Sequence, residues 1–193
     1  MSRNLEIEVK GLLSKEEYEL ILSSFDKQKC YKQINYYIDT KEFLIRAKNC
    51  GLRIREKLGK YELTLKVKQR EGKLEINEDL TAKDVELFGN CGVFPGNEVK
   101  AYLVNNLQIP LQDLFIFVDM KTTRLDIPYN DSLISLDKSI CLGETDYEIE
   151  CESVSLSKAK KDLESFLLKY SLKYKKFSSS KLRRAIERYK ARQ

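Results

Sequence analysis

The 193-residue chain contains no histidine and no tryptophan. Without histidine it cannot build a Ser-His-Asp triad, a Cys-His nucleophile pair or a histidine-liganded zinc site. Any metal ion must instead be bound by oxygen atoms, which favours Mg²⁺, Mn²⁺ or Ca²⁺. The absence of one residue type therefore removes several classes of hydrolase and metalloprotein.

Cysteine is sparse, and long apolar runs are absent. The five cysteines are an odd number, are widely spaced and form no Cys-x-x-Cys pair. This pattern suits a reducing compartment, with thiols in packing or surface positions rather than in disulfides or a zinc site. No segment has the apolar length of a signal peptide or a membrane span. We therefore expect a cytoplasmic protein without membrane association.

The overall composition is globular but unusually charged. Hydrophobic residues make up 42% and charged residues 34%, with 35 basic and 30 acidic side chains giving a net charge of +5. The length is sufficient for one large domain with its own core, so we expect a single domain over residues 1–193. Because the net charge is small, only the local distribution of charge can indicate a binding partner.

The N-terminal stretch 5–10 alternates strictly between apolar and charged residues. Alternation with a period of two is typical of a β-strand whose side chains point to opposite faces. One face of this strand is apolar, and the other carries Glu6, Glu8 and Lys10. Taken alone, such a charged face is typical of a strand exposed to water.

Other predicted strands also carry charged faces, and the faces are sorted by sign. The strand at 144–152 places five carboxylates on one face, whereas the strands at 51–57 and 61–68 are basic. Side chains two residues apart lie about 7 Å apart, so these carboxylates repel one another. A solvated surface gives no reason to concentrate them in this way.

The sorted faces favour a closed or nearly closed antiparallel barrel, apolar outside under its helices and polar inside. Its interior would have an acidic wall opposite a basic wall. The acidic wall suits a divalent cation and the basic wall suits an anion, so a polyphosphate bound with Mg²⁺ satisfies both. Burying unpaired charges without such a ligand would cost several kcal/mol per ion unless the interior holds water.

Helices are predicted in three places. A helix begins at Ser14, where Glu17 completes a capping-box pattern. A helical insertion is expected at about 81–106, between two halves of the sheet, and two C-terminal helices at about 156–191. The second of these is expected to be capped by the serine run 178–180.

An ordered set of motifs resembles one known family. Glu6-x-Glu8-x-Lys10 looks like the ExExK signature of the CYTH superfamily, whose members are also called triphosphate tunnel metalloenzymes. The likeness continues in order along nearly the whole chain, through 37–40, 52–55, 65–68, Thr123-Arg124, Asp137 and Glu148-Ile149-Glu150.

The resemblance implies an α+β fold: an eight-stranded antiparallel β-barrel, the triphosphate tunnel, with helices packed outside and a C-terminal helical pair. It also implies three sets of site residues. The metal, Mg²⁺ or Mn²⁺, would be held by Glu6, Glu8, Asp137, Glu148 and Glu150. The substrate would be held by Lys10, Arg53, Arg55, Lys66, Lys68, Arg124 and Lys181. The catalytic set would be Glu6, Glu8, Lys10 and Glu75, with Glu75 beside a second metal or the attacking water.

The expected function is metal-dependent hydrolysis of a small-molecule triphosphate, either inorganic triphosphate or a nucleoside triphosphate. Two alternatives stay open: an adenylate cyclase of the class IV type, and a non-catalytic binder of polyphosphate or nucleotide. Thiamine triphosphate is disfavoured because thiamine-specific relatives have a tryptophan where this chain has Gly51. A nucleic-acid module is disfavoured because no outward basic stripe with interleaved aromatic residues is present. Family members often form dimers, so a homodimer is a further alternative.

Overall fold

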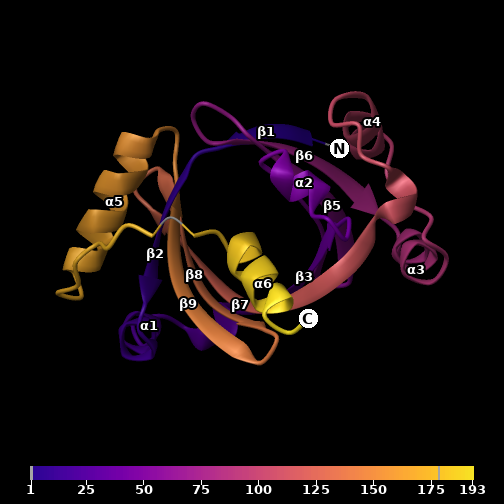
Figure 1. The fold of residues 1–193 in the computed structure, drawn as a ribbon. Coiled ribbons are helices and arrows are strands. Elements are labelled where there is room, and N and C mark those ends of the chain that lie inside the picture. Colours follow the sequence, from indigo (N-terminus) through magenta and orange to yellow (C-terminus); the bar gives the residue numbers. More distant parts are fainter. Residues whose placement is uncertain (1, 178) are drawn as a thin grey trace.

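The computed structural model describes residues 2–177 and 179–193, and within these residues nine strands form one antiparallel sheet. The strands are β1 (Ser2–Glu6), β2 (Glu8–Leu13), β3 (Tyr31–Asp39), β4 (Cys50–Lys57), β5 (Lys60–Lys68), β6 (Lys73–Leu80), β7 (Phe115–Tyr129), β8 (Ser132–Cys141) and β9 (Glu144–Glu152). The sheet is strongly curled, so that its strands surround a central space (Figure 1).

The order of strands explains how the sheet nearly closes. It runs β1-β6-β5-β4-β3-β7-β8-β9-β2, so its two terminal strands are consecutive in the chain and only Ile7 lies between them. Glu6 pairs with Lys73 of β6, whereas Glu8 pairs with Glu152 of β9. The N-terminal segment therefore crosses from one edge of the sheet to the other.

Because the chain crosses between the two edges, the sheet has one strand more than the eight that were predicted. The stretch 5–10 was expected to be one strand of eight, but the structure divides it at Ile7 and has nine strands. The carbonyl oxygen of Ile7 accepts a hydrogen bond from the Ser153 amide at 3.0 Å, outside both ladders. A single strand cannot pair with two edges that diverge, so the ladder changes partner at this residue. The antiparallel, curled architecture itself is confirmed.

Most of the helices pack on the outside of the curled sheet. The α-helices are α1 (Lys15–Leu22), α2 (Leu44–Ala47), α3 (Ala82–Cys91), α4 (Glu98–Asn105), α5 (Leu156–Leu168) and α6 (Lys181–Lys190), with 3₁₀ turns at Lys27–Lys29 and Leu111–Asp113. Residues of α3 and α4 pack on β4, β5 and β6, and those of α1 and α5 pack on β7, β8 and β9 (Figure 1). No helix in the described ranges has the length and apolarity needed to cross a bilayer.

Side-chain caps fix where these helices begin. The predicted capping box of Ser14 and Glu17 is present at α1, and Thr81 with Asp84 forms another at α3. Ser180 caps α6 by accepting from the Arg183 amide at 3.1 Å. Ser178, which was expected to share in this cap, lies outside the described residues.

The last helix, α6, lies on the inner side of the sheet at the opening of the central space (Figure 1). Its Ala185 and Ile186 are buried in a cluster that includes Tyr37 and Val118. At its N-terminal end Leu182 lies against Gly51 of β4, where an added Cβ would be only 2.7 Å from Leu182 Cδ2. Glycine at position 51 therefore allows α6 to approach the sheet closely.

Candidate functional site

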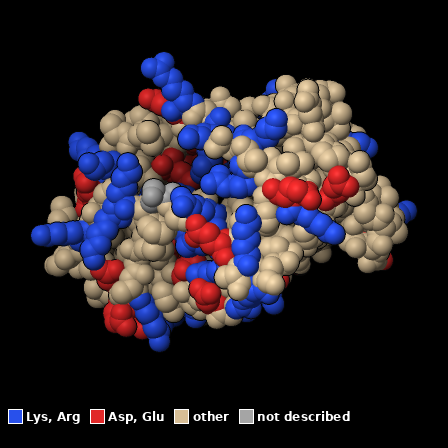
Figure 2. Space-filling view, viewed as in Figure 1, with Lys and Arg blue, Asp and Glu red and all other residues tan. Residues whose placement is uncertain are grey.

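The curled sheet encloses a cavity of about 560 Å³ with a strongly charged lining. Figure 2 shows a hollow in this face of the molecule, with basic side chains around acidic ones at depth. Among the described residues, the lining includes five glutamates, namely Glu6, Glu8, Glu75, Glu150 and Glu152. It also includes ten cations: Lys10, Arg46, Arg53, Arg55, Lys66, Lys68, Arg70, Lys73, Arg124 and Lys181.

Strand alternation places these side chains inside. On β4, Arg53 and Arg55 line the cavity, while Ile54 is buried in the outer hydrophobic core. On β5, Lys66 lines the cavity, while Leu65 is buried in the same core. Because side chains alternate across a strand, the same sequence pattern that builds the core also builds the charged lining.

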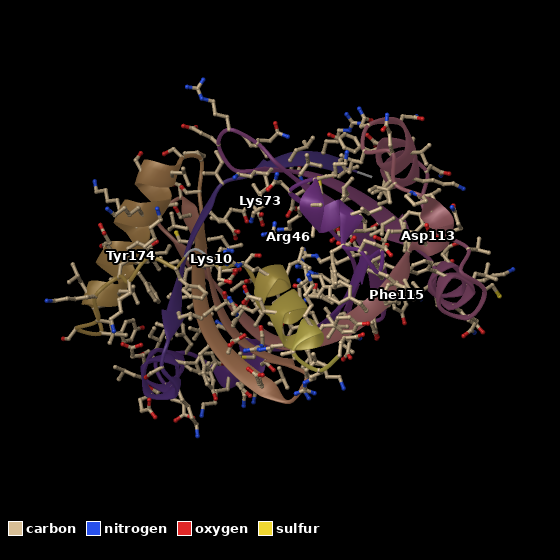
Figure 3. All side chains as sticks on the ribbon, in the orientation of Figure 1. Lys10, Arg46, Lys73, Asp113, Phe115 and Tyr174 are labelled. Atoms are coloured by element: carbon tan, nitrogen blue, oxygen red, sulfur yellow. The ribbon has the colours of Figure 1, made fainter. Side chains whose placement is uncertain are left out.

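Glu6, Glu8 and Glu150 form the acidic wall of the cavity, and each is paired with lysine side chains. Glu6 accepts from Lys66 at 2.7 Å, and Glu8 accepts from Lys10 at 2.8 Å and Lys73 at 2.6 Å. Lys10 Nζ also lies 3.6 Å from Glu150 Oε1, so this ammonium group stands between two carboxylates. Figure 3 shows Lys10 and Lys73 beside the central space.

These lysines keep the carboxylates ionised. Burial alone would raise the pKa of Glu8, and the charge of Glu150 adds to that effect. Lys10, Lys73 and Lys66 together outweigh both and lower the pKa to about 2. The pKa of Glu150 is likewise lowered well below its usual value, against burial, by Lys181, Lys10 and Arg124. Both groups are therefore carboxylates at neutral pH.

Two further predicted carboxylates, Asp137 and Glu148, lie beneath the cavity lining and are fully buried. Arg124 donates to Asp137 through Nε at 2.7 Å and Nη2 at 2.6 Å, and Lys181 Nζ lies 2.9 Å from the same carboxylate. Glu148 is paired with Lys181 at 3.0 Å and with Arg184 at 2.7 Å. The start of α6 thus supplies cations to the acidic wall.

The basic wall differs because its arginines lack carboxylate partners. Among the described residues, neither Arg53 nor Arg55 has an ion pair within 4.0 Å. Arg55 donates to Asn35 at 3.1 Å, and the buried Nε of Arg53 has no hydrogen-bond acceptor. Burial lowers the pKa of Arg55 to about 10, helped by the charges of Arg53 and Arg124. Neither guanidinium group is neutralised by an ion pair among the described residues, although Glu62 acts on Arg55 and Glu75 on Arg53 at longer range.

Glu75 lies between the two walls. It forms an ion pair with Lys66, which also binds Glu6. Burial alone would raise the pKa of Glu75, but Lys66, Arg53 and Asn77 together lower it to about 2. A carboxylate with so low a pKa is charged at neutral pH and is a weak proton acceptor.

The structure brings all the predicted site residues to one region, although Lys68 is exposed at the cavity's edge. Four cations among the described residues were missed by the sequence analysis, namely Arg46, Arg70, Lys73 and Arg184. Lys73 could have been found, since it shares a strand face with Glu75. Arg184 lies one helical turn after Lys181, a spacing that also signals a shared face. Arg46 lies on the four-residue helix α2, where no helix was predicted and where the chain is too short to show a periodic signal.

The donor atoms can be tested against a divalent cation. No three Asp, Glu, Cys or His side chains of the described residues converge as a ready metal cluster. The acidic wall nevertheless offers ionised carboxylate oxygens, which are the donors that Mg²⁺ and Mn²⁺ prefer. Glu148 Oε1 is buried and accepts no hydrogen bond. These carboxylate oxygens therefore fit such an ion. In this structure the same carboxylates are paired with lysine ammonium groups.

Comparison with known proteins gives one family and several relatives. The model of the CYTH domain matches residues 4–186. A protein from Bacillus subtilis named "Putative triphosphatase YjbK" is 34% identical over 193 residues, covering 99% of this chain and all of that protein. The match therefore extends over essentially the full described sheet and its helices.

Solved structures share the fold over nearly the whole chain. A protein from Bacillus halodurans named as a "putative adenylate cyclase" is 32% identical, with a TM-score of 0.88, over 95% of this chain and 98% of that one. HpAC1 from Hippeastrum is 23% identical, with a TM-score of 0.76, over 95% of this chain and 96% of that one. At 23% identity, the similarity to HpAC1 is evidence only of a shared fold.

Proposed function

The chain belongs to the CYTH family, and on that premise we propose that it is a triphosphatase that depends on Mg²⁺ or Mn²⁺. Its substrate would be inorganic triphosphate or a nucleoside triphosphate, bound in the charged cavity. The name of the Bacillus subtilis relative, which attributes triphosphatase activity to that protein, supports this proposal.

The observation that carries the proposal is the unpaired guanidinium groups of Arg53 and Arg55. They line the cavity, have no ion pair within 4.0 Å among the described residues, and leave the Arg53 Nε without an acceptor. Leaving buried donors unsatisfied is costly, and planar guanidinium groups match the oxygens of phosphate. A chain of phosphates would supply both the negative charge and the acceptors.

The carboxylates of the acidic wall would hold the metal ion. Glu6, Glu8 and Glu150 line the cavity and would be its nearest ligands, with Asp137 and Glu148 behind them. When bound, a divalent cation would neutralise phosphate charge and polarise the bond to be broken. The lysines now paired with these carboxylates would then be free to bind phosphate oxygens.

The chain's own residues would position the reactants. Arg53, Arg55 and Arg124 would grip the phosphate oxygens, together with Lys10, Lys66 and Lys181. Glu75 would orient the attacking water rather than remove its proton, because its pKa of about 2 makes it a weak base. The water oxygen bonds to the terminal phosphorus, the bond to the bridging oxygen breaks, and the released phosphates take up the proton. Inorganic triphosphate would give orthophosphate and pyrophosphate.

An adenylate cyclase is the second candidate, because a relative 32% identical to this chain bears that name. One observation favours hydrolysis. Among the described lining residues only Tyr37 has an aromatic ring, and this residue is only 5% exposed. The cavity therefore offers little surface on which an adenine could stack, whereas it offers many cations to phosphates.

The proposal is tested with a substrate panel of inorganic triphosphate, ATP and GTP. The purified protein is freed of metal, supplied with Mg²⁺ or Mn²⁺, and assayed for orthophosphate, pyrophosphate and cyclic AMP. We expect orthophosphate release that requires the added metal. Cyclic AMP with pyrophosphate would identify a cyclase instead, and tight binding in calorimetry without any product would identify a non-catalytic binder.

The Glu6→Ala variant tests whether Glu6 is a ligand of the proposed metal ion. We expect turnover to fall by about 10²-fold or more, because a proposed metal ligand is lost. Melting should change little, since Lys66 keeps its ion pair with Glu75. Glu86→Ala, on the exposed face of α3, is the control and should keep wild-type turnover. An active Glu6→Ala variant would contradict the assignment of the acidic wall.

A further inference from the structure

Among the described residues that line the cavity, those of strand β3 are all neutral. They are Gln33, Asn35 and Tyr37, and burial raises the pKa of Tyr37, so its phenol is uncharged at neutral pH. Every other strand that lines the cavity contributes at least one charged side chain from the described residues. Strand β3 nevertheless lies between β4 and β7, whose arginines line the same cavity. A neutral strand therefore separates two strands that carry arginine.

Asn35 binds one of these arginines directly. It is 2% exposed, and its Oδ1 accepts a hydrogen bond from the Nε of Arg55 at 3.1 Å. The two residues are cross-strand partners in the ladder between β3 and β4. Because a guanidinium group only donates, the amide atom that faces it must be the oxygen. This hydrogen bond fixes the guanidinium group through its Nε and leaves its two terminal nitrogens available to a ligand.

A second arginine of the lining shows what a carboxylate does in the same arrangement. Arg124 on β7 is the cross-strand partner of Asp137 on β8, as Arg55 is of Asn35. Its Nε donates to Asp137 at 2.7 Å, and its Nη2 donates to the same carboxylate at 2.6 Å. The aspartate therefore binds two nitrogens of the guanidinium group and neutralises its charge. Asparagine and aspartate have nearly the same size and shape, so the two pairs differ mainly in charge.

The charge of Arg55 destabilises the folded chain in the absence of a ligand. Burial lowers the pKa of Arg55 to about 10, and the charges of Arg53 and Arg124 act in the same direction. Glu62 is its cross-strand partner on β5 and opposes this effect only at longer range. A carboxylate in place of the Asn35 amide would relieve the repulsion through a direct ion pair. The amide leaves the charge for a bound anion to neutralise.

We propose that Asn35 is a positioning residue of the triphosphate site, which holds the guanidinium group of Arg55 in one direction without neutralising it. The inference rests on the proposed function, since the group to be bound by Arg55 is a phosphate of the substrate. Guanidinium groups bind phosphate oxygens through paired hydrogen bonds, which require a fixed orientation and an available charge. The oxygen of Asn35 supplies the orientation, and its lack of charge preserves the charge of Arg55. Affinity and stability are therefore opposed at this position.

Asn35→Asp separates affinity from stability, because it keeps the size and the acceptor of the side chain and adds a charge. The neighbouring guanidinium group of Arg55 favours the ionised form of the new carboxyl group. We expect the Kd for inorganic triphosphate, measured by calorimetry without metal, to rise by about tenfold or more. The Tm of the ligand-free chain should rise by about 2 to 4 °C, because a neutral hydrogen bond becomes a charge-assisted one. Loss of a residue with a purely structural role would lower affinity and stability together.

Asn35→Leu tests the hydrogen bond without adding a charge, since it leaves the Nε of Arg55 without its acceptor. We expect the Kd for inorganic triphosphate to rise by about three- to tenfold, because the guanidinium group is no longer held in one direction. In an Arg55→Gln background, Asn35→Leu should leave Kd within about twofold, and Asn35→Asp should no longer raise Tm. These double-mutant cycles measure whether both effects of Asn35 act through Arg55.

Asn90→Asp is the matched control, because Asn90 is exposed on α3 and does not line the cavity. It adds the same charge and should leave the Kd for triphosphate within about twofold. The positioning role would be overturned by a lower Tm of Asn35→Asp, by an unchanged Kd in both Asn35 variants, or by effects that persist without Arg55. A wild-type chain that does not bind triphosphate would overturn the proposed function and this inference with it. Binding by the wild-type chain with unchanged variants would overturn the inference alone.

Discussion

Single residues in this cavity owe their charge state to one another. Glu8 is the clearest case, since burial and Glu150 oppose its ionisation while three lysines favour it. Its side chain is only 12% exposed, so these interactions are weakly screened by solvent. Removing any one charge therefore changes the pKa of its neighbours as well as its own contact.

This coupling predicts a pH dependence of stability. The pKa of Glu8 is about 2 in the folded chain against 4.5 as its ordinary value. A lowered folded-state pKa contributes stability that is present above about pH 4.5 and is lost as the pH falls towards 2. Glu8 would contribute up to about 3 kcal/mol at neutral pH. Urea unfolding between pH 6 and pH 2.5 measures this loss.

Glu8→Gln is the comparison for that experiment, because it keeps the size of the side chain and removes the titrating group. We expect its free energy of unfolding to fall less steeply below pH 4.5 than that of the wild-type chain. Parallel curves for the two proteins would show that Glu8 does not titrate with the depressed pKa.

At the scale of elements, α6 positions the side chains of Lys181 and Arg184 against the carboxylates of the acidic wall. Arg184 bridges two carboxylates, with 2.7 Å to Glu148 and 3.0 Å to Asp146, and its side chain is 10% exposed. Lys181, one turn earlier, binds Glu150 at 2.8 Å. The helix is thus held by charge pairing at one face and by Ala185 and Ile186 at another.

Arg184→Gln is predicted to destabilise the chain. It removes both ion pairs and leaves the fully buried Glu148 with Lys181 as its remaining cation. Breaking a buried pair in this way costs about 3 kcal/mol, which lowers Tm by about 6 to 12 °C in a chain of this size. Thermal unfolding followed by circular dichroism gives the shift.

Arg183→Gln provides the neighbouring control. Arg183 is exposed and, within the part of the chain that the structure describes, pairs only with Glu187 on the same helix, at 2.8 Å. Such a surface pair is worth about 0.5 kcal/mol, so Tm should hardly move. Similar shifts for the two variants would mean that α6 is not held by its contacts with the acidic wall.

At the scale of the whole molecule, the cavity concentrates positive charge. Ten cations and five carboxylates of the described residues line the cavity, and neither Arg53 nor Arg55 has an ion pair within 4.0 Å among these residues. The folded chain therefore carries a repulsion that a bound polyanion would relieve. Ligand binding and folding stability should be coupled strongly.

This coupling predicts selective thermal stabilisation by a polyanion. Inorganic triphosphate at about 100 times its Kd should add about 2.7 kcal/mol to the free energy of unfolding. Thermal shift assays without metal measure the effect, with sodium chloride at matched ionic strength as the control. Equal shifts from the two salts would show only general screening of charge, and would contradict a specific anion site.

The sequence by itself determined the curled antiparallel sheet and which side chains face its interior. Alternation with a period of two fixes the face of each residue, so the residue pattern alone assigns Glu6, Glu8, Arg53 and Arg55 to one lining. Lys73 was equally accessible to this reasoning, and Arg184 was accessible to the helical spacing that places it on the same face as Lys181. The charge on each strand face then indicated that the basic strands bind an anion and the acidic strands bind a cation.

Only the tertiary structure decided the details that depend on contacts between distant segments. The break at Ile7 arises because the two edges of the curled sheet diverge, which no local pattern records. The full burial of Asp137 and Glu148 follows from the docking of α6, and the position of Arg46 from its anchor on Asp39. Local sequence sets the direction of a side chain along its own element, whereas its partners and its burial are set by packing.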